Sequence, residues 1–177
     1  MHEMSLNADS TEMVKIAQAF YMFLNEKVLP FYKKLGINQF SFRDNKLHQQ
    51  DIEVVFTMND RALRQIYDTQ TRKNRDTKFK PHNGDWMILI DAYSLFREDT
   101  TLYLPFKMIN EAFGMSQPSY VNEFDKGSLG EYNKLSYVEY LEFLARIAEL
   151  YFEGSEMEEL ELSVKLEYLL DELLPLV

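Results

Sequence analysis

Apolar residues recur at three- and four-residue spacings through almost every segment of this chain, and this periodicity restricts its fold more than any other feature. Between Asp9 and Val28 the recurring residues are Met13, Ile16, Ala17, Phe20, Phe23 and Leu24. Near the end of the chain they are Leu162, Leu166, Leu169, Leu170 and Leu173. This spacing places side chains on one face of a helix, whereas a half-buried strand needs alternation with a period of two. The sequence therefore predicts an all-α fold with roughly seven or eight helices and no strand.

Small polar residues and glycines predict where several of these helices begin and end. Asp9 stands three residues before Glu12, which is the spacing of a reciprocal N-cap pair. Thr57 or Asn59 is predicted to cap the helix that follows, because both side chains accept hydrogen bonds from free backbone N–H groups. Gly114 is predicted to end the helix before it.

A polar segment near the middle of the chain is the best linker candidate. The sequence "NRDTKFKPHNGD" holds Pro81 and Gly84 and almost no apolar residue. It predicts an N-terminal helical segment over residues 1–80 and a C-terminal helical domain over residues 85–177, with one shared core as the alternative. Within the second part, Trp86–Phe113 and Tyr120–Phe152 are predicted to form helical hairpins.

The composition favours a folded protein that acts in a reducing compartment. Hydrophobic residues make up 46% of the chain and aromatic residues 14%, which is ample for a packed interior. There is no cysteine, so disulfides, thiolate zinc sites and cysteine nucleophiles are excluded. No apolar run approaches the roughly 20 residues that span a bilayer. We expect a cytoplasmic protein that has no membrane contact.

The charge is negative overall but unevenly placed. The formal net charge of −10 argues against a nucleic-acid partner, because phosphate contacts need an excess of Lys and Arg. One segment is basic nonetheless, and we call it the basic strip. Its members are Arg61, Arg64, Arg72, Lys73, Arg75, Lys78 and Lys80. The strip is either a solvated face or a surface that binds an acidic partner.

The stretch "NKLSYVEYLEFLARIAELYFE" reads like the second half of a calcium-binding EF-hand. If Glu139 takes position 12 of the loop, Leu135 suits the apolar position 8. Counting back, however, places Ser128, Gly130 and Tyr132 at positions 1, 3 and 5, where the loop needs carboxylates.

The other register starts the loop at Asp125 and puts Gly130 at position 6, where the turn needs glycine. It then puts Ser136 at position 12 in place of the bidentate glutamate. Because neither register supplies the oxygen ligands, we predict no metal site and no cofactor.

The segment Tyr120–Phe152 therefore resembles a degenerate, metal-free EF-hand-like helical pair. Its exiting helix is also similar to segments in helical domains of ciliary and flagellar axonemal proteins. The residues that carry this likeness are Tyr137, Glu139, Tyr140, Leu141, Glu142, Leu144, Arg146, Ile147 and Ala148. The resemblance implies a place in a cytoskeletal assembly such as the axoneme, where tubulin would offer the basic strip an acidic surface. The alternative is that any amphipathic helix rich in Leu, Ala and Glu shows this pattern.

No catalytic signature is found in the sequence. His2, His48 and His82 lie in three separate polar segments, and no pair has the spacing of a helical zinc site. The six glycines form no phosphate-binding loop. We expect a protein that is not an enzyme, although scattered Asp, Tyr and His residues converging in the fold remain an alternative.

Tyrosines gather around the failed loop, and Tyr132, Tyr137 and Tyr140 are candidates for partner contact. Tyrosine suits interfaces because it joins a large apolar face to a hydroxyl group, although packing in the core is the other reading. The predicted function is a non-enzymatic structural or adaptor protein that works through protein–protein interfaces. The alternative is a calcium-regulated EF-hand-type switch that binds a target helix.

Overall fold

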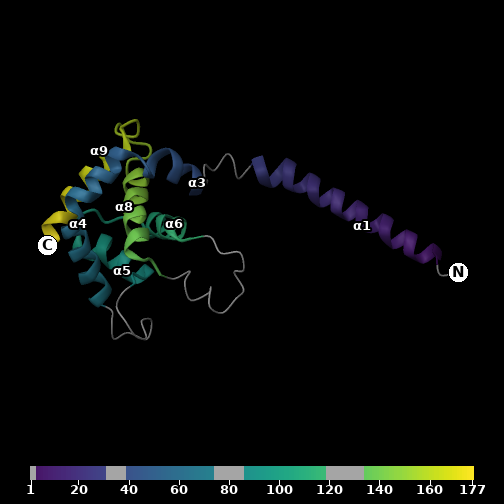
Figure 1. Ribbon diagram of the computed structural model, residues 1–177, viewed down its shortest axis with the longest axis horizontal. Coiled ribbons are helices and arrows are strands. Elements are labelled where there is room, and N and C mark those ends of the chain that lie inside the picture. Colours follow the sequence, from purple (N-terminus) through teal and green to yellow (C-terminus); the bar gives the residue numbers. More distant parts are fainter. Residues whose placement is uncertain (1–2, 31–38, 74–85, 119–133) are drawn as a thin grey trace. The chain divides into compact units, whose positions relative to one another are not determined.

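Helices account for nearly all regular structure in this protein. The structure, a computed structural model, describes residues 3–30, 39–73, 86–118 and 134–177, and of residues 3–11 and 39–40 it describes the backbone alone (Figure 1). No strand occurs in these ranges; one isolated β-bridge does. The predicted all-α fold is therefore confirmed for the described part of the chain.

The chain divides into two compact units, Met1–Phe40 and Ser41–Val177. The predicted boundary lay at residues 80–85, with one shared core as the alternative. α4 (Gln50–Lys73), which that boundary assigned to the N-terminal segment, packs against the helices of the second unit. Its buried side chains include Ile52, Val55, Leu63 and Ile66, which belong to the same core as α8 (Tyr137–Tyr151).

The first unit is built around one long helix. It consists of α1 (Glu3–Phe23) and the π-helical turn η1 (Leu24–Val28). The predicted N-cap at Asp9 is wrong, because α1 begins at Glu3 and Asp9 lies inside it. The preceding residues contain neither Gly nor Pro, so no residue stops the helix before Asp9.

The second unit contains the remaining elements. In chain order after α3 (Gln39–Phe42), which straddles the boundary, they are the π-helical turn η2 (Arg43–Leu47), α4, α5 (Leu89–Ser94), the π-helical turn η3 (Leu95–Asp99), α6 (Phe106–Ser116), α8, α9 (Leu162–Leu173) and the 3₁₀ turn η4 (Leu174–Leu176). In this unit α8 lies between α6 and the pair formed by α4 and α9 (Figure 1).

Two further predicted helix ends are wrong. Thr57 and Asn59 lie inside α4, which begins seven residues before Thr57 at Gln50. The Asn59 amide donates to the Val55 carbonyl at 2.9 Å instead of capping a helix. Gly114 lies inside α6, which continues to Ser116. A helix tolerates one glycine at about 1 kcal/mol, and burial of the neighbouring Phe113 favours continuation.

The core of the second unit is centred on α8. Four of its large side chains are fully buried, namely Tyr140, Phe143, Leu144 and Ile147. Phe143 meets Phe96 and Phe113 edge to face, with ring centroids 5.7 and 6.1 Å apart. Such contacts add to the stabilisation that burial of the rings provides. These buried side chains make α8 the central element of the core.

Two segments that lead into helices are joined side by side. Met87, just before α5, and Leu135, just before α8, form an antiparallel bridge whose two N–O distances are 2.9 and 2.8 Å. The hydroxyl of Tyr67, on α4, donates to the Leu135 carbonyl at 2.8 Å. Asp91 follows Met87 by four residues, and Glu139 follows Leu135 by four residues.

Each of these carboxylates closes the first turn of its own helix. The Ile88 N–H donates to Asp91 at 2.9 Å, and the Ser136 N–H donates to Glu139 at 2.6 Å. Each bond satisfies a backbone donor at the start of a helix. The starts of α5 and α8 are therefore built alike and held together by the bridge between Met87 and Leu135.

Candidate functional site

The basic strip is exposed where the structure describes it, but most of its charges have acidic neighbours. Arg61, Arg64, Arg72 and Lys73 lie on exposed positions of α4. Arg64 pairs with Asp60 at 2.9 Å, Arg72 with Asp68 at 3.7 Å, and Lys73 with Asp99. Arg75, Lys78 and Lys80 lie outside the described residues. The charge that this surface presents to a partner is therefore smaller than the sequence indicates.

The candidate tyrosines take different environments. Tyr140 is fully buried, Tyr137 is half-buried, and Tyr132 lies outside the described residues. The ring of Tyr140 packs against those of Tyr67 and Tyr137, with centroids 5.3 and 6.1 Å away. Burial raises the pKa of Tyr140 well above its usual value. Tyr140 is a core residue that joins α8 to α4, which corrects its assignment to partner contact.

Tyr137 is held by the polar side chains of α4. Its hydroxyl donates to the Asp60 carboxylate at 3.0 Å, and the guanidinium of Arg64 lies 4.1 Å from the centre of its ring. Burial and then the bond to Asp60 raise the pKa of Tyr137, so the phenol stays neutral at physiological pH. The hydrogen bond from Arg64 lowers the pKa of Asp60 and keeps that carboxylate charged.

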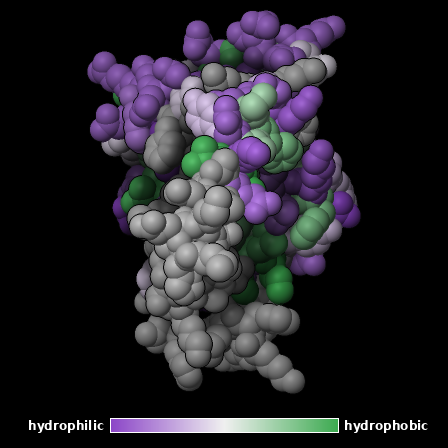
Figure 2. All heavy atoms as spheres, turned by 90° about the vertical axis from the view of Figure 1, so that its right-hand side faces the viewer, coloured by the Kyte–Doolittle hydropathy of each residue, from purple (hydrophilic) through white to green (hydrophobic). Residues whose placement is uncertain are grey.

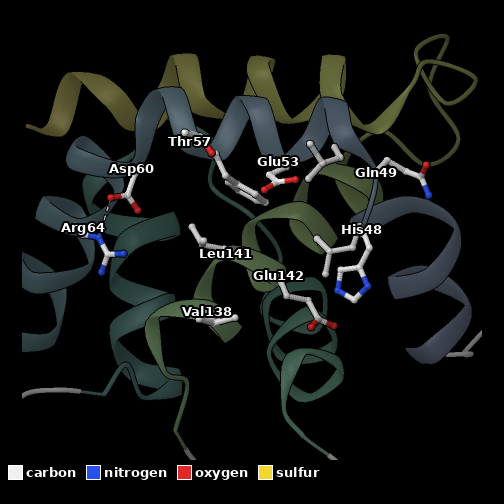
Figure 3. Close-up of a pocket in the computed structure, with 12 residues that line it drawn as sticks. His48, Gln49, Glu53, Thr57, Asp60, Arg64, Val138, Leu141 and Glu142 are labelled. Carbon is white, nitrogen blue, oxygen red and sulfur yellow. Dashed lines mark hydrogen bonds and ion pairs between the residues drawn. The ribbon is translucent and has the colours of Figure 1, made fainter.

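A groove of about 690 Å³ lies beside this cluster, between η2, α4 and α8. Its apolar lining comes from all three elements and consists of Leu47, Ile52, Phe56, Val138 and Leu141. Val138 is 74% exposed, whereas Ile52 at the base is 2% exposed. In Figure 3, Val138 and Leu141 lie across the groove from Glu53 and Thr57 of α4.

The polar lining of the groove includes the carboxylates of Glu53, Asp60 and Glu142 and the guanidinium of Arg64. Asp60 pairs with Arg64, and Glu142 pairs with two arginines outside the groove lining. Figure 3 shows Asp60 and Arg64 at one end, with His48 and Gln49 at the other. An apolar floor bordered by Glu53 and by these ion pairs is suited to an amphipathic segment.

One edge of the groove is fixed by a buried ionic network around Glu142. Arg43 of η2 donates to both carboxylate oxygens, at 3.0 and 2.9 Å, and Arg146 of α8 donates at 2.7 Å. Arg146 also lies over the ring of Phe42, 4.3 Å from its centre. Burial lowers the pKa of Arg146, although the contact with Glu142 favours its charged form. The network attaches η2, and with it Leu47, to α8.

Glu139, the residue that would close a calcium loop, caps α8 instead. Its carboxylate accepts from the Ser136 N–H, while the Ser136 hydroxyl accepts from the Glu139 N–H at 3.5 Å. Ser128 and Gly130 of the tested loop lie outside the described residues. Within the described residues, no group of three or more His, Asp or Glu side chains is arranged to hold a metal ion.

The sequence does not predict the groove, although two local patterns mark residues that lie beside it. Glu142 and Arg146 stand four residues apart on α8, which is the spacing of an ion pair. Ser136 and Glu139 have the spacing of a capping box, which would have set the start of α8. Neither signal reveals that residues 47–64 lie beside residues 138–142, because that contact depends on the packing of distant helices.

Comparisons of the chain with models of protein families, with curated proteins and with solved structures found no match. No helix in the described ranges combines the length and apolar character needed to cross a membrane.

Proposed function

We propose that this protein is a non-enzymatic adaptor that receives a helix of a partner protein in the groove between η2, α4 and α8. The observation that carries the proposal is the groove itself, which has an apolar base and a strongly exposed apolar residue, Val138, on its wall. Apolar side chains open to water at a concave site are typical of surfaces that bind other proteins.

The proposed occupant is an amphipathic helix with an apolar face and basic flanking residues. The apolar face would cover Phe56, Val138 and Leu141, and a flanking basic residue would meet Glu53. The net charge of −10 would favour the approach of such a helix over long distances. Helix-in-groove binding uses anchors at three- and four-residue spacings, and this groove is lined by residues of α4 from Gln50–Lys73 on one side and of α8 on the other.

The second unit is proposed to be an EF-hand-like pair without a calcium-binding role. This interpretation is supported by the bridge between Met87 and Leu135, which joins the two segments that lead into α5 and α8. The similar starts of α5 and α8 add support. In such a pair the capping carboxylates serve the helices, and the groove is formed without an ion.

We also propose that the basic strip binds an acidic surface within a cytoskeletal assembly, namely tubulin in the ciliary axoneme. The support is the sequence likeness carried by Tyr137–Ala148, together with the exposed cations of the basic strip. Co-sedimentation with microtubules over a salt series tests this part. Charge reversal at Arg72, Lys73 and Arg75 should abolish binding, and unchanged binding would remove tubulin as the partner.

The groove is tested with a fluorescent helical peptide of about 20 residues that has Leu and Phe anchors and flanking lysines. Fluorescence anisotropy should show binding that is weakened at least tenfold by Val138→Glu, because the substitution places a carboxylate on the apolar wall. The matched control is Val164→Glu, which adds the same charge to the first turn of α9 at an exposed apolar position.

A second control separates shape from charge. A peptide of the same composition with its anchors scrambled keeps its attraction to an acidic protein but has no apolar face. Equal binding of both peptides, or equal effects of Val138→Glu and Val164→Glu, would contradict the proposed groove.

A further inference from the structure

The helix α1 carries an apolar surface that its own unit does not cover. Among the residues of α1 and η1 with described side chains, the large apolar ones that are exposed are Met13, Val14, Ile16, Phe20, Tyr21, Met22, Phe23 and Val28. Phe20 is 61% exposed and Ile16 is 64% exposed. Over the molecule as a whole, Figure 2 shows hydrophobic and hydrophilic side chains mixed on one face, without distinguishing the elements that carry them. Helices of this kind are stabilised mainly by burial of their apolar face against a partner.

One subset of the apolar residues of α1 and η1 forms a seam along the helix. Met13, Ile16, Phe20 and Leu24 follow one another at steps of three or four residues. The π-helical turn η1, in which the Leu29 N–H bonds to the Leu24 carbonyl, advances each residue by a smaller angle than an α-helix does. It thereby brings Val28 back over the seam. The seam has the form of a helix–helix contact of the coiled-coil type.

Charges on one flank of the seam indicate which partner it fits. Glu12 and Lys27 both lie roughly 60–80° to the same side of the seam's centre. Lys15 and Glu26 point farther away from it, and the opposite flank carries Val14, Gln18 and Tyr21, which are uncharged. In an antiparallel pair of helices the same flank of each helix faces its counterpart. In an antiparallel pair, Glu12 of each copy would therefore face Lys27 of the other, which gives two ion pairs. A parallel pair would bring neither of these ion pairs together.

We propose that α1 pairs antiparallel with α1 of a second copy of this chain, with Phe20 near the two-fold axis. In this register Ile16 meets Leu24 of the other copy, and Met13 meets Val28. The contact is isologous, so both copies bury the same face and the assembly closes as a dimer. The dimer would carry two copies of the groove in the second unit, although the pairing does not depend on what the groove binds.

The mass of the full chain in solution is the primary test. Sedimentation equilibrium should give twice the chain mass of 21.0 kDa. Phe20→Asp should lower the measured mass to that of one chain. The substitution would bury two carboxylates, one from each copy, beside each other in an apolar contact. A wild-type protein that stays at one chain mass at all concentrations would overturn the proposal, since α1 would then be covered by its own chain or by another protein.

Charge variants test the register without removing the apolar seam. Lys27→Glu should weaken dimerisation about tenfold, because two attractive pairs become repulsive. Adding Glu12→Lys to it should restore the wild-type dissociation constant. Lys15→Glu is the matched control, since it makes the same charge change away from the seam and should have no effect. Equal weakening by Lys15→Glu and Lys27→Glu would refute the antiparallel register.

Cross-linking reports the orientation directly, because the natural chain has no cysteine. Chains with Glu12→Cys are mixed with chains with Lys27→Cys and oxidised. Antiparallel pairing should give a disulfide between the two different chains. Cross-links that join only identical chains would show parallel pairing and would overturn the proposal.

Discussion

At the scale of single residues, Glu142 joins parts of the chain that lie about a hundred positions apart. Its carboxylate accepts from Arg43 in η2 and from Arg146 one turn farther along α8. The side chains of Glu142 and Arg146 are 9% and 8% exposed, so both charges lie largely out of water. Buried charges are tolerated when they are paired, and they become strongly destabilising when one partner is removed.

Replacing Glu142 with glutamine should therefore lower the free energy of unfolding of the second unit by about 3 kcal/mol. The change keeps the shape of the side chain but leaves Arg43 and Arg146 without their carboxylate. Urea unfolding followed by circular dichroism measures the loss. Glu153→Gln, at an exposed position after α8, is the control. A loss of stability no larger than that of the control would contradict the role of Glu142.

Two neighbouring tyrosines should respond in opposite ways to loss of the hydroxyl. The hydroxyl of Tyr140 is buried without a hydrogen-bond partner among the described residues, whereas that of Tyr137 donates to Asp60. Tyr140→Phe should leave stability unchanged or raise it by up to about 1 kcal/mol, since a buried unpaired hydroxyl is unfavourable. Tyr137→Phe should lower stability by about 1 kcal/mol. Thermal unfolding of both variants compares them, and a destabilised Tyr140→Phe would show that its hydroxyl is bonded.

At the scale of helices, the sequence pattern at the start of α8 fits two different roles for one glutamate, a calcium ligand and a helix cap. Glu139 stands where the closing ligand of a calcium loop would be, yet its carboxylate bonds to the Ser136 N–H. Glutamine fills the same role in a capping box as glutamate does. This equivalence allows the capping role to be tested apart from any role in binding calcium.

Glu139→Gln should change stability by less than about 0.5 kcal/mol, because the reciprocal cap is retained. Ser136→Ala, which removes the other half of the cap, should lower stability by about 1 kcal/mol. Isothermal titration with calcium should show no tight uptake by the wild-type chain. Tight uptake that disappears in Glu139→Gln would support a calcium switch instead of a metal-free pair.

Sequence periodicity was sufficient for the helical class and for the buried face of α9, whose buried leucines follow the predicted stripe. In the stripe predicted for the first helix, by contrast, Met13, Ile16 and Phe20 are exposed. Helix starts were predicted poorly at Asp9, Thr57 and Asn59, because a capping residue inside a helix has the same sequence signature as one at its start. The groove was not predicted, because Phe56 and Leu141 meet only after α4 has packed on α8.

At the scale of the whole molecule, two surfaces have different proposed partners. The groove is proposed to receive a basic, amphipathic helix of another protein, and the seam of α1 is proposed to receive a second copy of the chain. A dimer with two grooves would bind two sites on one partner assembly, which raises its effective affinity without any new contact. Phe20→Asp should therefore reduce binding to a partner with repeated sites while leaving the affinity for a single peptide unchanged.

The measurement that tests the groove most directly is methyl-group NMR of the full chain during titration with the amphipathic helical peptide. The adaptor proposal predicts that the methyl signals of Leu47, Ile52, Val138 and Leu141 shift together and saturate. The methyl signals of Val164 and Leu176, on α9 and η4, should stay in place. Shifts that spread over α9 instead, or no shift in the groove at saturating peptide, would contradict the adaptor function proposed for this groove.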